Sequence, residues 1–146
     1  IMLCEGAFPL METDEMNYAI LQGAARALKP GGKFIFTTLN GLFPLFHSVK
    51  VFLDREQGEG GGECRESSFD LMTFRDRNLT AFQDDQGNRR ELRCNERYYV
   101  PSEIAWLLKS LGFSGIGIYG ARIGAFSRGD PLTTEDFEML VVAEKK

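Results

Sequence analysis

The sequence predicts an α/β fold: a small parallel sheet with a short antiparallel β insert. Two apolar runs, residues 1–8 and 33–39, flank an amphipathic segment, which is the pattern of a strand–helix–strand crossover. Residues 64–100 instead hold short strand-like pieces with no helix between them, which favours local antiparallel pairing. At 146 residues and 43% hydrophobic content, the chain fits one domain with a real core.

The first predicted unit runs from residue 1 to residue 28. "IMLCEGAF" is apolar almost throughout, as in a strand that is buried on both faces. Residues 13–28 predict a helix, because Thr13 or Asp14 can cap it and apolar residues recur every three or four positions. The predicted buried face consists of Ile20, Leu21, Ala24, Ala25 and Leu28.

The segment "LKPGG" predicts a tight reversal from this helix into the next strand. Pro30 cannot continue a helix, and Gly31 and Gly32 both accept positive φ. Residues 33–39, "KFIFTTL", then have strand composition.

Residues 40–56 predict a single helix, followed by a glycine-rich loop at 56–63. The helical stripe would be Leu45, Phe46, Val49, Phe52 and Leu53. The insert is expected to contain strands at 67–76, 78–85 and 89–100, with "DDQGN" as the hairpin turn between the last two.

The C-terminal part predicts one more helix and two strands. Pro101 suits the first position of the helix, and Gly112 suits its C-terminal end. A strand is expected at 114–120, a long connection at 121–136 and an apolar closing strand at 137–145.

Composition narrows the class of function. The net charge is −4 and there is no basic run, so nucleic-acid binding is not favoured. Cys4, Cys64, Cys94 and the single His47 have no metal-ligand spacing, so we expect no metal, no disulfide framework and reduced thiols in a cytoplasmic compartment. No stretch of 18 apolar residues exists, so we expect no membrane span.

Four segments in order resemble the class I S-adenosylmethionine-dependent methyltransferase family. They are "IMLCEGAF", "RALKPGGKFIFTT", "RYYVPSEIAWLLKSLGF" and "FEMLVVAEKK". The resemblance implies a partial Rossmann-like sheet of strands four to seven, the last one antiparallel. It implies that residues 1–146 are the C-terminal part of one methyltransferase domain, and that the insert at 64–100 roofs the substrate pocket.

One departure from the family pattern has structural consequences. The family holds its cofactor mainly through a glycine-rich loop after the first strand and an acidic residue after the second; neither is in this sequence. We therefore expect a missing N-terminal half, or a second chain, to cover residues 1–8, since an exposed edge strand invites pairing. A homodimer would serve the same purpose.

The resemblance also implies where S-adenosylmethionine and the acceptor contact the chain. The cofactor would lie against Cys4, Glu5, Gly6, Ala7 and Phe8, at the end of the fourth strand. The substrate candidates are Asn40, Phe46, His47, Tyr98, Tyr99 and Arg122, the last of which, like Arg128, we expect in the loop before the closing strand.

Each candidate has a simpler alternative. Asn40 is as well suited to capping the next helix, and Phe46 to the core. Strand alternation would send only one of Tyr98 and Tyr99 into the pocket. His47 and Tyr99 are weak candidates for a catalytic role, and the catalytic residues otherwise stay open.

The function expected from the resemblance is methyl transfer to a small-molecule acceptor by an enzyme of which this chain is a structural fragment. The absence of an obvious base pair favours an amine or an already acidic acceptor. The alternative is a non-catalytic binding or scaffold domain derived from that fold. The antiparallel closing strand argues against half of a nucleotide-linked oxidoreductase.

Overall fold

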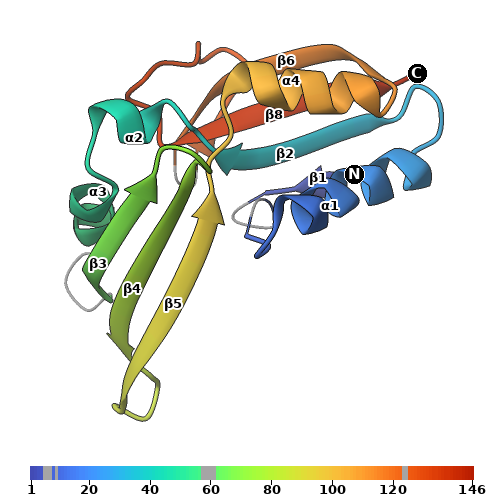
Figure 1. Ribbon diagram of the computed structural model, residues 1–146. Helices are drawn as coiled ribbons and strands as arrows, with labels where there is room; N and C mark the ends of the chain where they lie inside the picture. Colours follow the sequence, from blue (N-terminus) through green and yellow to red (C-terminus); the bar gives the residue numbers. More distant parts are fainter. Residues whose placement is uncertain (5–7, 9, 57–61, 123–124) are drawn as a thin grey trace.

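The computed structural model describes residues 1–4, 8, 10–56, 62–122 and 125–146, which form two sheets and four helices (Figure 1). The larger sheet has the order β1-β2-β8-β6-β7, and the smaller one, within the insert, has the order β3-β4-β5. The larger sheet comprises β1 (Met2–Leu3), β2 (Lys33–Leu39), β6 (Phe113–Arg122), β7 (Ala125–Phe126) and β8 (Glu138–Lys145). The insert comprises β3 (Glu63–Asp70), β4 (Arg75–Gln83) and β5 (Arg89–Arg97). The helices are α1 (Asp14–Ala27), α2 (Phe43–Phe46), α3 (Val49–Glu56) and α4 (Pro101–Ser110).

The strand directions confirm the predicted topology. β1 is parallel to β2, with Met2 opposite Ile35 and Leu3 opposite Phe36. β8 lies between β2 and β6 and is antiparallel to both. The closing strand therefore fills the space between two strands that run in the same direction, and β1 forms one edge of the sheet.

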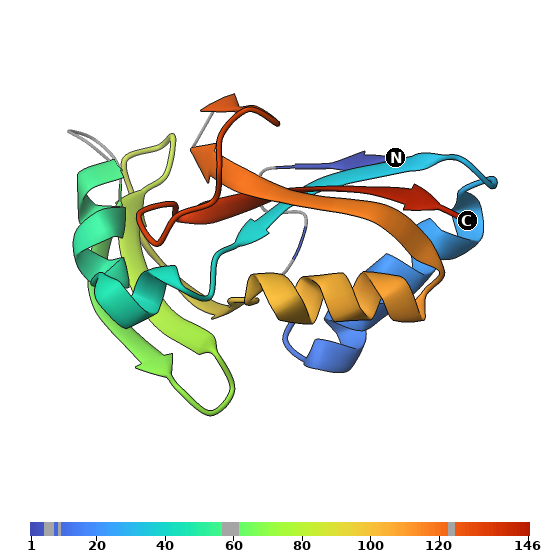
Figure 2. The same ribbon diagram turned by 90° about the horizontal axis from the view of Figure 1, so that it is seen from above.

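The main core lies on one face of the larger sheet. α1 and α4 both pack on that face (Figures 1 and 2). Aromatic side chains dominate the contact: the Phe34 ring centroid lies 4.7 Å from that of Phe36 and 5.8 Å from that of Phe113. Further buried residues of this core are Leu21, Ala24, Ala25, Ile104, Leu108, Met139, Val141 and Ala143. The predicted helical face of α1 is therefore confirmed at Leu21, Ala24 and Ala25.

Thr13 caps the N-terminus of α1, where its hydroxyl accepts from the Met16 amide at 3.3 Å.

The turn between α1 and β2 needs two glycines for different reasons. Gly31 has φ +76°, as predicted. The expectation of positive φ at Gly32 is wrong. A Cβ there would lie 2.8 Å from both Leu28 Cδ2 and the Lys29 carbonyl oxygen, so Gly32 is needed for space.

The single helix predicted over 40–56 is wrong: α2 ends at Phe46 and α3 begins at Val49. His47 between them is extended, with φ −133° and ψ 152°. The Ser48 hydroxyl accepts from the Val51 amide at 3.3 Å, so it starts a new helix. Because of this interruption, the residues of the predicted helical stripe do not all face the core. Val49 is buried, whereas Phe46 is 67% exposed and Leu45 is exposed.

The insert matches its predicted turn at one end only. "DDQGN" connects β4 and β5, and Gly87 in it has φ +81°. The strand predicted over 67–76 is wrong at its centre, because 71–74 form the turn between β3 and β4. The Asp70 carboxylate holds that turn by accepting from the Met72 amide at 2.8 Å and the Thr73 hydroxyl at 2.9 Å.

The connection before the closing strand is more ordered than the sequence indicates. β6 extends to Arg122 and pairs with the short β7, with Ala121 opposite Phe126. Arg122 is thus the last residue of a strand, which corrects its predicted place in a loop. Arg128 does lie in the connection and is exposed. In the part of the chain described, no helix has the length and apolar character to cross a membrane.

Candidate functional site

The candidate site lies where the insert returns to the end of β2. Asn40 and Tyr99 form an isolated parallel bridge. The Tyr99 amide donates to the Leu39 carbonyl at 3.2 Å, and the Gly41 amide donates to the Tyr99 carbonyl at 2.9 Å. A Cβ on Gly41 would come within 3.0 Å of the Tyr99 backbone, so a glycine permits this close approach. These contacts fix the insert to the carboxyl end of β2, where ligands of open α/β sheets bind.

Tyr98 and Tyr99 are both buried but pack on different sides of this junction. Tyr98 lies with Leu39 and Val49 in a second apolar cluster, partly covered by Phe69 and Phe137. Tyr99 belongs to the main core. Strand alternation separates the two rings, as expected, but each faces a packed interior.

Tyr99 is surrounded by aromatic and charged groups. Its ring stacks on Phe8 with 5.3 Å between centroids and an interplanar angle of 14°. The Arg97 guanidinium carbon lies 4.3 Å from the centre of the Tyr99 ring. Burial chiefly raises the pKa of Tyr99, to about 12, with a contribution from the Asp14 charge. The phenol is therefore protonated at neutral pH, so it can hydrogen-bond but is a poor base.

Asp14, Arg75 and Arg97 form an ion cluster, called here the Asp14 cluster, that connects the insert to α1. Asp14 accepts from Arg75 at 2.7 Å and from Arg97 Nε at 3.3 Å. Arg75 also donates to the Met11 carbonyl at 3.1 Å, and Arg97 also pairs with Glu103. Both arginine side chains are 8% exposed, whereas that of Asp14 is 53% exposed, so two buried guanidinium groups meet a carboxylate that water still reaches.

The pKa of Asp14 reflects two opposed effects. Burial is the largest effect and would raise the pKa above 3.8, but the hydrogen bonds and charges of Arg75 and Arg97 together outweigh it and lower the pKa. The carboxylate is therefore ionised at neutral pH, as pairing with two guanidinium groups requires.

Asn40 uses its side chain within the fold. Its residue is fully buried, and its Nδ2 donates to the carbonyls of Thr133 and Asp136 at 3.2 and 2.8 Å. Its Oδ1 accepts from the Leu42 amide at 3.0 Å, just before α2. Asn40 thus forms a side-chain turn ahead of α2. The capping alternative is wrong, because the N-cap residue of α2 is Leu42 and no side chain caps that helix.

His47 lies between α2 and α3, on the side on which Tyr98 also packs. Its Nε2 is 3.1 Å from Glu135 Oε1, and its ring lies 4.7 Å from that of Phe43. With Val51 and Arg55, these residues line a depression of about 290 Å³. Tyr99 lines a different depression, with Asp14 and Glu103, so the two catalytic candidates do not share a cavity.

The segment predicted to contact the cofactor is described only in part. Cys4 is half-buried. Phe8 is 1% exposed, and its ring contacts Tyr99 face to face and Phe36 edge to face, so it packs against protein. Glu5, Gly6 and Ala7 lie outside the described residues, as does the side chain of Arg122.

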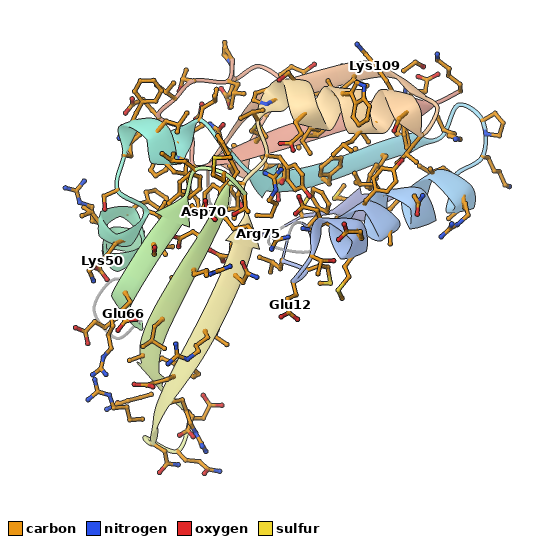
Figure 3. All side chains as sticks on the ribbon, viewed as in Figure 1. Glu12, Lys50, Glu66, Asp70, Arg75 and Lys109 are labelled. Atoms are coloured by element: carbon orange, nitrogen blue, oxygen red, sulfur yellow. The ribbon has the colours of Figure 1, made fainter. Side chains whose placement is uncertain are left out.

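A groove of about 700 Å³ lies between the insert and the segment that leads into α1. Asn95 Nδ2 donates to the Glu12 carbonyl at 3.4 Å beside it, which joins β5 to that segment. Figure 3 shows Glu12 beside β5 and Glu66 on β3, two strands away. The lining includes Leu10, Glu12, Glu66, Ser68, Arg77, Leu79, Arg93 and Asn95.

Sequence reasoning missed these groove residues. The available signal was alternation: Arg77 and Leu79 are two residues apart on β4, and Leu79 pairs with Arg93 across the sheet. In the described ranges no cluster of histidine, cysteine and acidic residues could hold a metal ion.

Structural comparison gives matches where sequence comparison gives none. No protein-family model matches the chain, and no curated protein matches it by sequence. The fold matches the methyltransferase CcbJ from Streptomyces caelestis with a TM-score of 0.70 and 13% identity. It matches an S-adenosylmethionine-dependent methyltransferase from Clostridium acetobutylicum with a TM-score of 0.66 and 14% identity.

Both alignments cover 99% of this chain but only 59% and 57% of the other two. A third match, at a TM-score of 0.50 and 15% identity, is the glycopeptide N-methyltransferase MtfA in complex with S-adenosylmethionine, of which 52% is covered. The chain thus has the fold of a part of class I methyltransferases and spans between half and three fifths of their length.

Proposed function

We propose that this chain is the acceptor-side part of an S-adenosylmethionine-dependent methyltransferase that acts on a small molecule. The observation that carries the proposal is the strand order β1-β2-β8-β6, with β1 and β2 parallel and β8 antiparallel between its neighbours. This arrangement aligns over almost the whole chain with two methyltransferases.

The described residues do not by themselves fit the donor. Phe8, the described aromatic of the predicted cofactor segment, is covered by Phe36 and Tyr99. The glycine-rich loop and acidic residue of the family are absent from the sequence. We therefore propose that a preceding segment or a second chain supplies most of the donor contacts, and we assign no step of the transfer to Phe8.

The residues of this chain would position the acceptor. Methyl transfer from S-adenosylmethionine is a displacement at carbon, which requires the acceptor to lie in line and close. The Asn40–Tyr99 bridge and the Asp14 cluster attach the insert at the carboxyl end of β2, which supports a role of the insert in this placement. Its groove, on the side of residues 10–12, is the proposed acceptor pocket.

Calorimetric titration with S-adenosylhomocysteine tests the proposal. We expect little or no binding to this chain alone, and clear binding once the chain is joined to the segment encoded before it. Joined protein that folds but takes up no S-adenosylhomocysteine would refute the enzyme and favour the second candidate, a binding or scaffold domain derived from the fold. That candidate draws on the lack of a donor loop in this sequence.

The preceding coding sequence discriminates the two candidates before any protein is made. The enzyme requires a strand that ends in a glycine-rich turn and, later, an acidic residue at a strand end. A scaffold domain has no need of either feature.

A further inference from the structure

We propose that the groove beneath the insert binds an anionic group, a carboxylate or a phosphate, through Arg77 and Arg93. The inference deepens the proposed function, on which its reading as an acceptor site rests, because it gives the acceptor a chemical class.

Strand register places the two arginines on the same face of the insert. Leu79 is paired with Arg93, and Arg77 with Asn95. Arg77 and Leu79 are two residues apart, so Arg77 and Arg93 are diagonal neighbours on one face. Such neighbours lie about 7–8 Å apart at the backbone, so two long side chains can reach one bound group.

The two arginines of the groove differ from the other arginines of the insert, which take part in ion pairs. Arg65 pairs with Glu63 and Glu91, and Arg90 pairs with Asp84. By contrast, no ion pair within the described part of the chain involves Arg77 or Arg93, and both residues are exposed. Two guanidinium groups are thus available to a ligand on the wall of one cavity.

Three carboxylates line the groove, those of Glu12, Glu66 and Glu96. Glu96 belongs to the opposite face of β5 from Arg93 and accepts a hydrogen bond from Asn78 at 3.1 Å. The other two are less suited to share a ligand. Glu66 belongs to β3 and Glu12 lies beside β5, so the width of β4 separates them (Figure 3). Neighbouring strands are about 4.8 Å apart, which puts roughly 10 Å between the strands that flank β4. A ligand that lies over Leu79 would meet both arginines but one of these two carboxylates, that of Glu66, which is paired with Leu79, so the balance of charge favours an anion.

The floor between the arginines is apolar and the nearby amide is neutral. Leu79 is 8% exposed and lies directly opposite Arg93. Asn95, opposite Arg77, lines the same cavity. This combination suits an acceptor with an apolar body and one anionic end, because the arginines fix its orientation and Leu79 contacts its body.

The test is a titration of the chain in which the NMR signals of the arginine Nε–H groups are monitored. Inorganic phosphate and succinate serve as the two probes, and ethylammonium serves as the cationic counter-probe. We expect a saturable shift at Arg77 and Arg93 with phosphate, succinate or both, with a dissociation constant on the order of 1 mM. The probe that saturates identifies phosphate or carboxylate as the bound group.

Arg77→Gln and Arg93→Gln should each weaken the affinity for the anion by about fivefold to tenfold, because each removes one charge-assisted contact. Arg128→Gln is the matched control, since Arg128 is also exposed but lies in the connection before β8. Circular dichroism verifies that the variants fold.

Shifts that never saturate, equal affinities in all three variants, or saturation by ethylammonium alone would overturn the proposal. The result is independent of donor binding, since this titration contains no S-adenosylhomocysteine. If the groove binds no anion, the methyltransferase proposal is unaffected. If the groove binds an anion but the joined protein binds no S-adenosylhomocysteine, only the methyltransferase proposal is refuted.

Discussion

Tyr98 and Tyr99 are neighbours in the chain, but their hydroxyl groups have opposite surroundings. The Tyr98 hydroxyl is buried and, among the described residues, has no hydrogen-bond partner. The Tyr99 hydroxyl shares a side-chain hydrogen bond with Asn17. Burial is also the largest of the effects that raise the pKa of Tyr98. The two phenols therefore stabilise the fold differently.

Removing each hydroxyl should change the free energy of unfolding differently in the two variants. Tyr98→Phe deletes a buried polar atom without a partner, so we expect it to be neutral or to stabilise by up to about 1 kcal/mol. Tyr99→Phe breaks a hydrogen bond and should cost about 1 kcal/mol. Urea unfolding of the two variants is the measurement. A clear loss in Tyr98→Phe would show that its hydroxyl is bonded after all.

The Asp14 cluster joins two elements, the insert and α1, that are far apart in sequence. The pairs between residues 14 and 75 and between 14 and 97 span 61 and 83 positions. The same α1 terminus carries Glu15, for which no ion pair exists among the described residues. The ion pairs of Asp14 therefore stabilise the contact between the insert and α1, whereas Glu15 interacts with the dipole of the helix.

Asp14→Asn should destabilise the chain by about 1–2 kcal/mol, because it leaves Arg75 and part of Arg97 without an anion. This is below the cost of breaking a fully buried pair, since the Asp14 side chain is 53% exposed and water screens it. Glu15→Gln is the control, and it should change stability by less than about 0.5 kcal/mol. Equal losses in the two variants would assign the effect to the helix terminus.

The effect of Asp14→Asn should also depend on pH. The pKa of Asp14 is lowered from 3.8, so its stabilisation is fully present above that value and is lost as pH falls through the lower pKa of the folded state. The stability difference between wild type and Asp14→Asn should thus be constant above about pH 5 and should shrink in acid. Chemical unfolding at a series of pH values measures it.

At the scale of the whole molecule, the larger sheet has one covered face and one open edge. α1 and α4 share a face, and β1 forms an edge at which Met2 is 66% exposed. On the opposite face, Ile35 and Val142 are half-buried. An apolar edge strand of this kind offers unpaired backbone groups to another chain.

The chain by itself should therefore self-associate through β1. Light scattering should show a mass that rises with concentration, and Met2→Lys should reduce that rise, because a lysine on an edge strand opposes pairing. Met72→Lys is the control, since Met72 is 91% exposed but lies in the turn between β3 and β4. A monodisperse wild-type monomer with slow amide exchange at residues 2–5 would contradict the expectation.

Most elements of the fold could be predicted because their signals are local. Thr13 and Gly31 mark the ends of α1, Pro101 opens α4, and "DDQGN" closes a hairpin. The errors arose where two local signals compete. Ser48 starts a new helix, although the helical spacing of apolar residues continues unbroken on both sides of it. Asp70 holds a turn whose apolar residues have the composition of a strand.

The candidate site was less accessible to sequence reasoning. The sequence indicates Asn40, Tyr98 and Tyr99, which do meet at one junction, but it holds no sign that Asp14 pairs with Arg75 and Arg97. For Arg77 and Arg93 the sequence holds one sign, the alternation along each strand, but not the pairing that brings the two residues together. Their common face follows from the register between β4 and β5, which pairs residues that are not adjacent in the chain.

The sequence by itself determined the parallel pair β1–β2, the helix between them and the antiparallel insert, because caps, turn residues and apolar periods act over a few positions. Only the tertiary structure decided that β8 lies between β2 and β6, that the insert is tied to α1 and that two arginines share a groove. Those features depend on contacts across 14 positions, between Leu79 and Arg93, to 111 positions, between Lys33 and Glu144. Their partners are selected by the burial of a whole face and the pairing of charges in three dimensions.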